Sequence, residues 1–180
     1  IMVSLRNQDQ VVFIDEETGL VEENWTLGSD GNYDVMHAQH NPDYINESMG
    51  GPAVIVADSE QNRLLEYQRT ASGEWERTWR WSDARLRWPR DADRLPNGNT
   101  LVSNTRGDQV FEIAPNGSVT WQINFPRPYE TERLGTGDES TNGPSATRAG
   151  LASRGDDDAR ASQSANSGPL TTFRNSVLGL

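Results

Sequence analysis

The sequence predicts an all-β fold, namely a β-propeller of four-stranded blades followed by a disordered C-terminal tail. The first observation is an internal repeat, in which residues 3–14, 56–67 and 102–113 align with one another at spacings of 53 and 46 residues. Each copy contains a short apolar strand, a polar turn and a second apolar strand. Repeats of about 40 to 50 residues that each hold four short strands are typical of β-propellers.

A second repeat supplies the strand that begins each blade. Residues 90–96 match residues 129–135 at a spacing of 39, and residues 39–44 match both more loosely. One further strand follows each copy of the first repeat and ends in tryptophan, after a turn that contains glycine. The chain therefore enters partway through one blade, completes two blades at about 36–82 and 88–125, and starts another within its last repeat.

The polar turn of each copy centres on a short side chain, which is Asp9, Asn62 or Asp108. Asn and Asp tolerate left-handed backbone and accept hydrogen bonds from nearby N–H groups, so their recurrence at one turn indicates a structural cap on a tight hairpin. The alternative is calcium binding by these side chains or by the acidic run 156–158. The spacing of a known calcium loop is absent from both places.

The composition changes near residue 136. Residues 1–135 hold the predicted blades, whereas residues 136–180 are rich in Gly, Ser, Thr, Asn, Ala and Asp, and Phe173 is their only aromatic residue. Such a segment has too few apolar groups to offset the entropy lost on ordering. Two regions are therefore predicted, a partial propeller over 1–135 and a flexible tail over 136–180.

The charge and the residue usage exclude several classes of protein. The chain of 180 residues has no Cys and a formal net charge of −11, and its 16 Lys-or-Arg residues are all Arg. The lack of Cys excludes disulfide scaffolds and thiolate zinc sites. Without a basic stripe, nucleic acid is not an expected partner. An acidic chain without Lys is typical of halophilic organisms, and a GC-rich genome that favours Arg codons is the alternative.

Three glycosylation sequons begin at Asn24, Asn46 and Asn116, in predicted turns or strand ends. They indicate an extracellular or cell-surface glycoprotein. Residues 1–5 already have the pattern of a strand, so we expect any signal peptide or membrane anchor to lie outside this sequence. Further blades are expected from the same or another chain, because a lone blade cannot bury both faces of its sheet.

The run from Trp88 to Val102, with its Leu-Pro-Asn-Gly-Asn-Thr-Leu core at residues 95–101, resembles the arylsulfotransferase family of β-propellers. The continuation through residues 108–113 and 119–121 resembles the haloarchaeal members of that family. The resemblance implies a propeller of about six blades outside the cytoplasm, of which this chain covers roughly three to four.

The resemblance also implies a nucleophilic histidine in the central channel, at the start of an innermost strand. That place holds His40 in one blade, Arg90 and Asp91 in the next, and Tyr129 and Glu130 in the one after. His40 is therefore the expected nucleophile, because a neutral imidazole can attack the sulfur of a sulfate ester. The alternative is that His40 packs at its strand start and hydrogen-bonds to a neighbouring blade.

Arg90 and Arg94 are expected to bind sulfate oxygens, since a guanidinium group binds such anions through two parallel N–H donors. Alternation along the strand places both arginines on one face, and Asp91 and Asp93 on the other. The alternative is a structural ring, in which Asp93, Arg94 and the matching residues 132–133 form ion pairs between blades.

The expected function is transfer of a sulfuryl group from an aryl sulfate to a phenolic acceptor through His40, without a cofactor or a metal ion. One alternative is a non-catalytic scaffold at the cell surface that binds or interacts with other molecules, which Asp91 and Glu130 favour because they repel anionic substrates. Another is a propeller hydrolase or lactonase, whose channel metal would be held by His40, Asp91 and Glu130.

Overall fold

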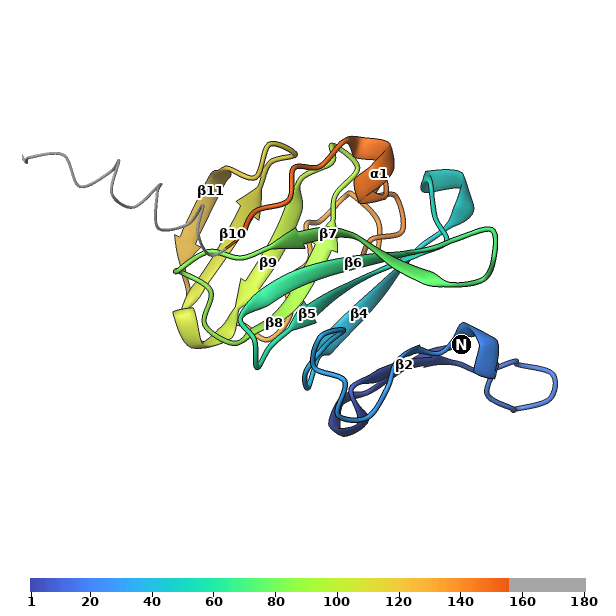
Figure 1. Cartoon of the computed structure of the whole chain (residues 1–180). Helices are drawn as coiled ribbons and strands as arrows, with labels where there is room; N and C mark the ends of the chain where they lie inside the picture. The colour runs from blue at the N-terminus through green and yellow to red at the C-terminus, as the bar shows by residue number, and fades with distance from the viewer. Residues whose placement is uncertain (156–180) are drawn as a thin grey trace, which may run out of the picture.

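A computed structural model describes residues 1–155, which form three antiparallel sheets side by side (Figure 1). The first sheet contains β1 (Met2–Leu5), β2 (Gln10–Phe13) and β3 (Leu27–Gly28). The second contains β4 (His40–Ile45), β5 (Ala53–Asp58), β6 (Arg63–Arg69) and β7 (Trp75–Trp81). The third contains β8 (Pro89–Arg94), β9 (Thr100–Asn104), β10 (Gln109–Ile113) and β11 (Val119–Asn124). The predicted all-β architecture of four-stranded blades is confirmed.

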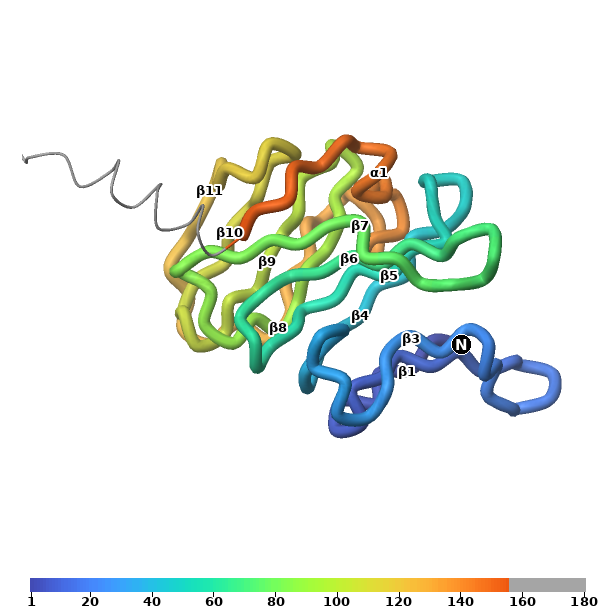
Figure 2. Tube along the Cα trace, in the orientation of Figure 1, coloured from blue at the N-terminus to red at the C-terminus, as the bar shows by residue number. Residues whose placement is uncertain are grey.

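Short helical turns join the strands, and the chain passes from one sheet to the next in sequence order (Figure 2). These turns are the 3-10 helices η1 (Arg6–Gln8), η2 (Glu23–Trp25), η3 (Glu47–Met49) and η4 (Thr105–Gly107), and the α-helix α1 (Ala146–Ala149). Within residues 1–155, no helix has the length and apolar character needed to cross a membrane.

The sequence of β5 shows how the sheets stack. All six of its residues are buried, as expected for an apolar strand that is covered on both faces. Ile55 and Ala57 belong to the apolar cluster shared with the third sheet, whereas Val54 and Val56 belong to the cluster shared with the first. Alternate side chains of this strand therefore join it to the sheets on either side.

The largest side chains of the core lie between the second and third sheets. Trp79 and Trp81 on β7 are buried and pack in one cluster with Phe111 of β10. Their indole N–H groups donate to the backbone oxygens of Ala152 and Gly117, at 3.1 and 3.0 Å. Both tryptophans therefore pack between the sheets. Each indole N–H has the hydrogen-bond acceptor that a buried indole requires.

The turn that the sequence analysis singled out has one geometry in all three sheets. Asp9, Asn62 and Asp108 have left-handed φ angles of 53°, 51° and 52°. Each side chain accepts a hydrogen bond from the backbone N–H that precedes the next blade, namely that of Ala38 (2.7 Å), Trp88 (2.6 Å) or Arg127 (3.0 Å). The predicted structural role of the turn is confirmed, and the turn also joins neighbouring blades.

The residues that donate this bond are in left-handed conformations themselves, with φ angles of 47°, 52° and 49° for Ala38, Trp88 and Arg127. Such angles are uncommon for residues other than glycine and are kept only where the surroundings enforce them. Because the geometry repeats, the residues two positions later take equivalent places: His40, Arg90 and Tyr129.

The expected boundary at residue 135 does not coincide with the end of the packed structure. Residues 129–133 form no strand, although Thr131 donates its N–H to Asp91 at 3.1 Å. Residues 136–155 then cross the top of the sheets in Figure 1, and Arg154 forms a parallel bridge with Trp81 on β7. Ser145 caps α1, and Ala146 joins the core. A few apolar contacts thus order a stretch whose composition predicts flexibility.

The remainder of the predicted tail lies outside the described residues. It comprises residues 156–180 and includes the acidic run 156–158 considered as a calcium ligand.

Candidate functional site

His40 is the first residue of β4 and is partly exposed. Its Nδ1 atom lies 2.7 Å from Oγ of Ser59. The Ser59 hydroxyl is 2.6 Å from the backbone oxygen of Pro89, to which it donates its single proton. Ser59 must then accept from His40, so Nδ1 carries the imidazole proton and Nε2 carries the lone pair. The backbone of Ala38 also hydrogen-bonds to the imidazole ring.

The surroundings of His40 keep its imidazole neutral. Burial, followed by the positive charges of Arg6 and Arg90, lowers the pKa of His40 to about 4. At pH 7 the ring is therefore uncharged, and its Nε2 lone pair is available for nucleophilic attack.

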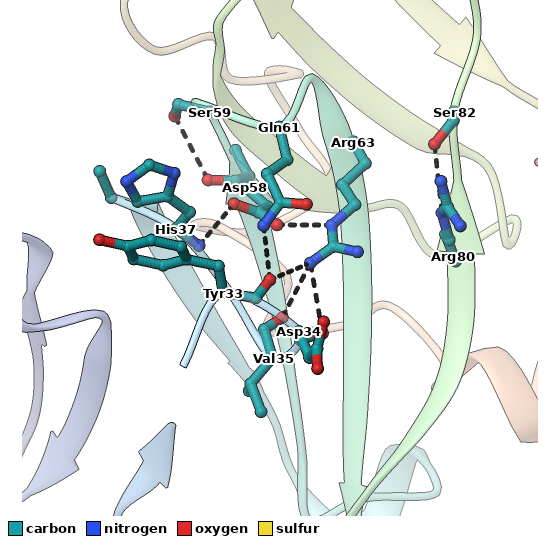
Figure 3. Close-up of polar contacts among 12 residues, drawn as sticks. Tyr33, Asp34, Val35, His37, Asp58, Ser59, Gln61, Arg63, Arg80 and Ser82 are labelled. Carbon is teal, nitrogen blue, oxygen red and sulfur yellow. Dashed lines mark hydrogen bonds and ion pairs between the residues drawn. The ribbon is translucent and has the colours of Figure 1, made fainter. Parts of the chain in front are cut away.

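The loop that precedes His40 is fixed by a buried ion pair. Asp58 accepts from Nε of Arg63 at 2.5 Å and from the backbone N–H of His37 at 2.8 Å (Figure 3). Arg63 also donates to the backbone oxygen of Tyr33 at 3.1 Å. The ring of His37 stacks on that of Tyr33, with centroids 4.0 Å apart. These contacts assign His37 to the supporting loop.

A pocket of about 430 Å³ opens beside the start of β8, and three of its lining residues are arginines. It is lined by Trp88, Arg90, Thr105, Arg106 and Arg127. A neighbouring pocket of about 220 Å³ shares Trp88 and Arg106 with the first and reaches Ser59, the partner of His40. We call the two together the arginine pocket. A concentration of guanidinium groups of this kind favours an anionic ligand.

Trp88 is the centre of the arginine pocket. The guanidinium carbons of Arg90 and Arg106 lie 4.3 and 4.2 Å from its ring centroid, within cation–π range. The His40 ring meets Trp88 edge to face, with centroids 5.1 Å apart. Arg90 also lies 4.3 Å from the ring of Tyr129. His40 and Arg90 therefore meet at one indole ring, and Tyr129 lies on Arg90.

The structure brings two of the three expected site residues together, His40 and Arg90. The third, Arg94, is fully buried, and its guanidinium lies 3.0 Å from the Glu66 carboxylate in the neighbouring sheet. It also donates to Thr100 and to the backbone of Pro144, both at 3.1 Å. The contacts of Arg94 give no support to a role in ligand binding, since they are made within the packed interior.

Ion pairs do form between the blades, but with other partners than expected. Arg94 pairs with Glu66 and Arg133 pairs with Glu112, so the acids of these pairs are not the expected Asp93 and Glu132. Glu66 and Glu112 are at equivalent positions of the repeat, 46 residues apart. Burial raises the pKa of Glu66 and lowers that of Arg94, and the attraction between the two groups opposes both shifts.

Sequence reasoning missed two arginines of the pocket, Arg106 and Arg127. The repeat contained the information needed to find these residues. Arg127 aligns with Trp88, and Arg106 lies in the turn that follows the next strand. That turn and the loop before β8 meet, as the 2.9 Å bond from the Arg106 N–H to the oxygen of Arg87 shows. Superposing the repeats on a propeller blade would have placed these residues together.

A group of carboxylates lies further along the innermost strands. Asp43 on β4 and Asp93 on β8 are buried, and each offers an oxygen within 4.8 Å of the other and of Glu139. Burial and the neighbouring acids raise the pKa of Asp93 to about 10 and that of Asp91 to about 7. These oxygens could hold a cation. Three residues were considered above as metal ligands. His40 and Asp91 are not members of this group, whereas Glu130 belongs to a second, exposed group with Glu132 and Glu139.

Solved structures of β-propeller proteins are similar to this chain. A periplasmic gluconolactonase from Pseudomonas aeruginosa aligns with 71% of the chain at 20% identity and a TM-score of 0.55. A putative 6-phosphogluconolactonase from Bacteroides fragilis aligns with 72% at 14% identity and a TM-score of 0.53. The chain spans 37% of the length of each of these proteins. No protein-family model and no curated protein matches the sequence.

These similarities show a β-propeller fold and a partial propeller in this chain. They give the arylsulfotransferase resemblance no support of their own, because at such identities only the fold is shared.

Proposed function

We propose that this chain contributes the sulfuryl-accepting site of an extracellular arylsulfotransferase-like propeller, with His40 as the nucleophile. The observation that carries the proposal is the neutral His40, whose Nδ1 is held by Ser59, beside the arginine pocket. A nucleophile and a set of fixed cations are what transfer of a negatively charged group requires.

The chemistry proceeds in two displacements. The lone pair of His40 Nε2 attacks the sulfur of an aryl sulfate, an N–S bond forms, and the bond between sulfur and the aryl oxygen breaks with its electrons leaving on the phenoxide. A phenol oxygen then attacks the same sulfur, loses its proton to solvent, and the N–S bond breaks to restore the imidazole. Ser59, by fixing the tautomer, keeps Nε2 unprotonated for the first step.

Arg90 is the donor closest to this chemistry, since it shares Trp88 with His40. Arg106 and Arg127, which line the same pocket, take the place that sequence reasoning gave to Arg94. They neutralise the sulfate oxygens as charge moves toward the leaving group. The exposed ring of Tyr129 offers a flat surface for the aryl group.

The extracellular location is proposed on the sequons. Asn24 and Asn116 are exposed and accessible for glycosylation. The side-chain oxygen of Asn46 accepts from Ser48 Oγ at 2.6 Å and from the Met49 N–H at 3.1 Å. That of Asn116 likewise accepts from the hydroxyl and the N–H of Ser118, at 2.7 and 3.0 Å.

A non-catalytic scaffold that binds or interacts at the cell surface is the second candidate. The observation that favours it is the row of acids directly after the blade-start residues, which includes buried Asp91 and exposed Glu130. These negative charges disfavour binding of an anion in the channel. In this candidate function the exposed loops form the binding surface instead.

The deciding experiment measures turnover of a chromogenic aryl sulfate with a phenolic acceptor, using the full-length protein that contains this chain. We expect His40→Ala to abolish turnover, and Arg90→Ala to reduce it roughly 10²- to 10³-fold, as loss of a preorganised donor does. His37→Ala is the matched control and should retain activity. Wild-type protein that binds aryl sulfates no better than sulfate-free phenols would establish the scaffold instead.

A further inference from the structure

The innermost segments of three successive blades carry a carboxylate at one equivalent position. Asp43 stands three residues after His40, Asp93 three after Arg90, and Glu132 three after Tyr129. Since the blade starts share one backbone geometry, these side chains project toward the same region. Glu139 adds a fourth carboxylate, because its oxygen lies within 4.8 Å of those of Asp43 and Asp93, and also of Glu132.

The buried members of this group lack a positive partner. Asp93 is 1% exposed and its Oδ1 atom has no hydrogen-bond partner among the described residues, while its carboxyl group shares a hydrogen bond with that of Asp43. The arginines next in sequence are committed elsewhere, Arg94 to Glu66 and Arg133 to Glu112. An isolated buried carboxylate is costly unless a proton or a cation compensates its charge.

The loop that carries Glu139 is held against both strands. The N–H and the hydroxyl of Ser140 bond to Oδ2 of Asp43, at 3.1 and 2.7 Å. The same hydroxyl accepts from the backbone N–H of Arg94 at 2.8 Å. Ser140 thus fixes the position of the neighbouring Glu139 relative to Asp43 and Asp93, so the three carboxylates form a built arrangement with a defined spacing.

We propose that Asp43, Asp93 and Glu139 bind a hard divalent cation, and that Ca²⁺ is the ion that fits. Oxygen atoms at about 2.3–2.6 Å from a Ca²⁺ ion can stand up to about 5 Å apart, which accommodates the 4.8 Å limit on their separations. The ligand set contains oxygen alone, without the nitrogen or sulfur ligands that transition metals prefer. The ion would tie the loop at Glu139 to two neighbouring blades. This site is separate from the arginine pocket and does not depend on the proposed sulfotransfer.

The test is a Ca²⁺ titration of the metal-free protein at constant ionic strength, followed by isothermal calorimetry and by thermal unfolding. Wild-type protein should bind one Ca²⁺ ion and unfold at a higher temperature in its presence. Asp93→Asn and Glu139→Gln should each weaken Ca²⁺ binding by about tenfold or more, because affinity follows the charge and number of the ligands. Glu76→Gln, on the exposed face of β7, is the matched control and should bind as wild type does.

Two results would overturn the proposal. One is the absence of calorimetric binding and of a thermal shift in wild-type protein. The other is a Ca²⁺ affinity that stays at the wild-type value in Glu139→Gln. Because Glu139 is exposed, this variant is expected to fold. His40→Ala should leave Ca²⁺ binding unchanged, so loss of sulfotransfer and loss of the ion are separate outcomes.

Discussion

The side-chain oxygen of Asn62 accepts a 2.6 Å hydrogen bond from the backbone N–H of Trp88. This bond joins the turn between β5 and β6 to the residue just before β8, and it fixes the backbone from which Arg90 extends into the arginine pocket. A structural turn of one blade therefore positions the candidate site of the next.

Replacing Asn62 by Ala should destabilise the protein by about 1–3 kcal/mol. The variant loses the bond to Trp88 and places a residue with no local side-chain acceptor in a left-handed conformation. Urea unfolding measures the change. Asn62→Asp is the control, since Asp108 performs the same role in the following blade, and it should unfold close to wild type. An Ala variant as stable as wild type would contradict the role assigned to this bond.

The buried pair of Arg94 and Glu66 should respond strongly to loss of one partner. Arg94→Met leaves an uncompensated carboxylate between the sheets and should cost about 3–5 kcal/mol, while adding Glu66→Leu should restore much of that loss. Arg6→Ala breaks the exposed pair with Glu60 and should change stability by less than about 1 kcal/mol. Chemical denaturation of the three variants tests the comparison, and equal losses from Arg94→Met and Arg6→Ala would refute it.

His40 should titrate at a pH well below that of an ordinary histidine. Its folded pKa of about 4 lies under the reference value of 6.5, so the unfolded chain binds the proton more readily. The contribution of His40 to stability is therefore complete above pH 6.5 and is lost as the pH falls toward 4. Because the chain has two histidines, NMR of a His37→Asn variant follows His40 alone. A midpoint near 6.5 would show that burial and the neighbouring arginines do not lower the pKa of His40.

Salt should stabilise the fold. With a formal charge of −11 and no Lys, the chain repels itself at low ionic strength, and the screening length shrinks to about 3 Å at 1 M salt. The melting temperature followed by circular dichroism should rise between about 0.1 M and 3 M KCl. An unchanged melting temperature over that range would count against the halophilic origin inferred from composition.

The repeats made the propeller predictable, because a period of similar length recurs with the same turn residues. The candidate site was harder to predict from the sequence, and Arg90 and Arg94 show why. Strict alternation along a strand places both on one face. In the structure, the register of β8 against β9 shifts between Pro89 and Asp91, and β4 has a matching shift between His40 and Asp43. These irregularities send Arg90 toward the pocket and Arg94 into the interior.

Residues 136–155 were mispredicted for a different reason. Their average composition resembles a linker, yet order here comes from a few specific contacts, such as the bond from Ala146 N–H to Glu66 at 2.6 Å. Contacts of this kind join positions 80 residues apart, and no local pattern reports them.

In the hydrogen bond between each turn and the next blade, the donor is a backbone N–H, so the side chain of the donor residue takes no part. That residue is Ala38 at one junction, Trp88 at the second and Arg127 at the third, while the geometry is unchanged. The side chain at a junction can therefore change in evolution while the hydrogen bond that holds the backbone there is kept. Each junction between blades can therefore change its side chains independently of the others. The proposed site of Trp88 and its surrounding arginines lies at one such junction.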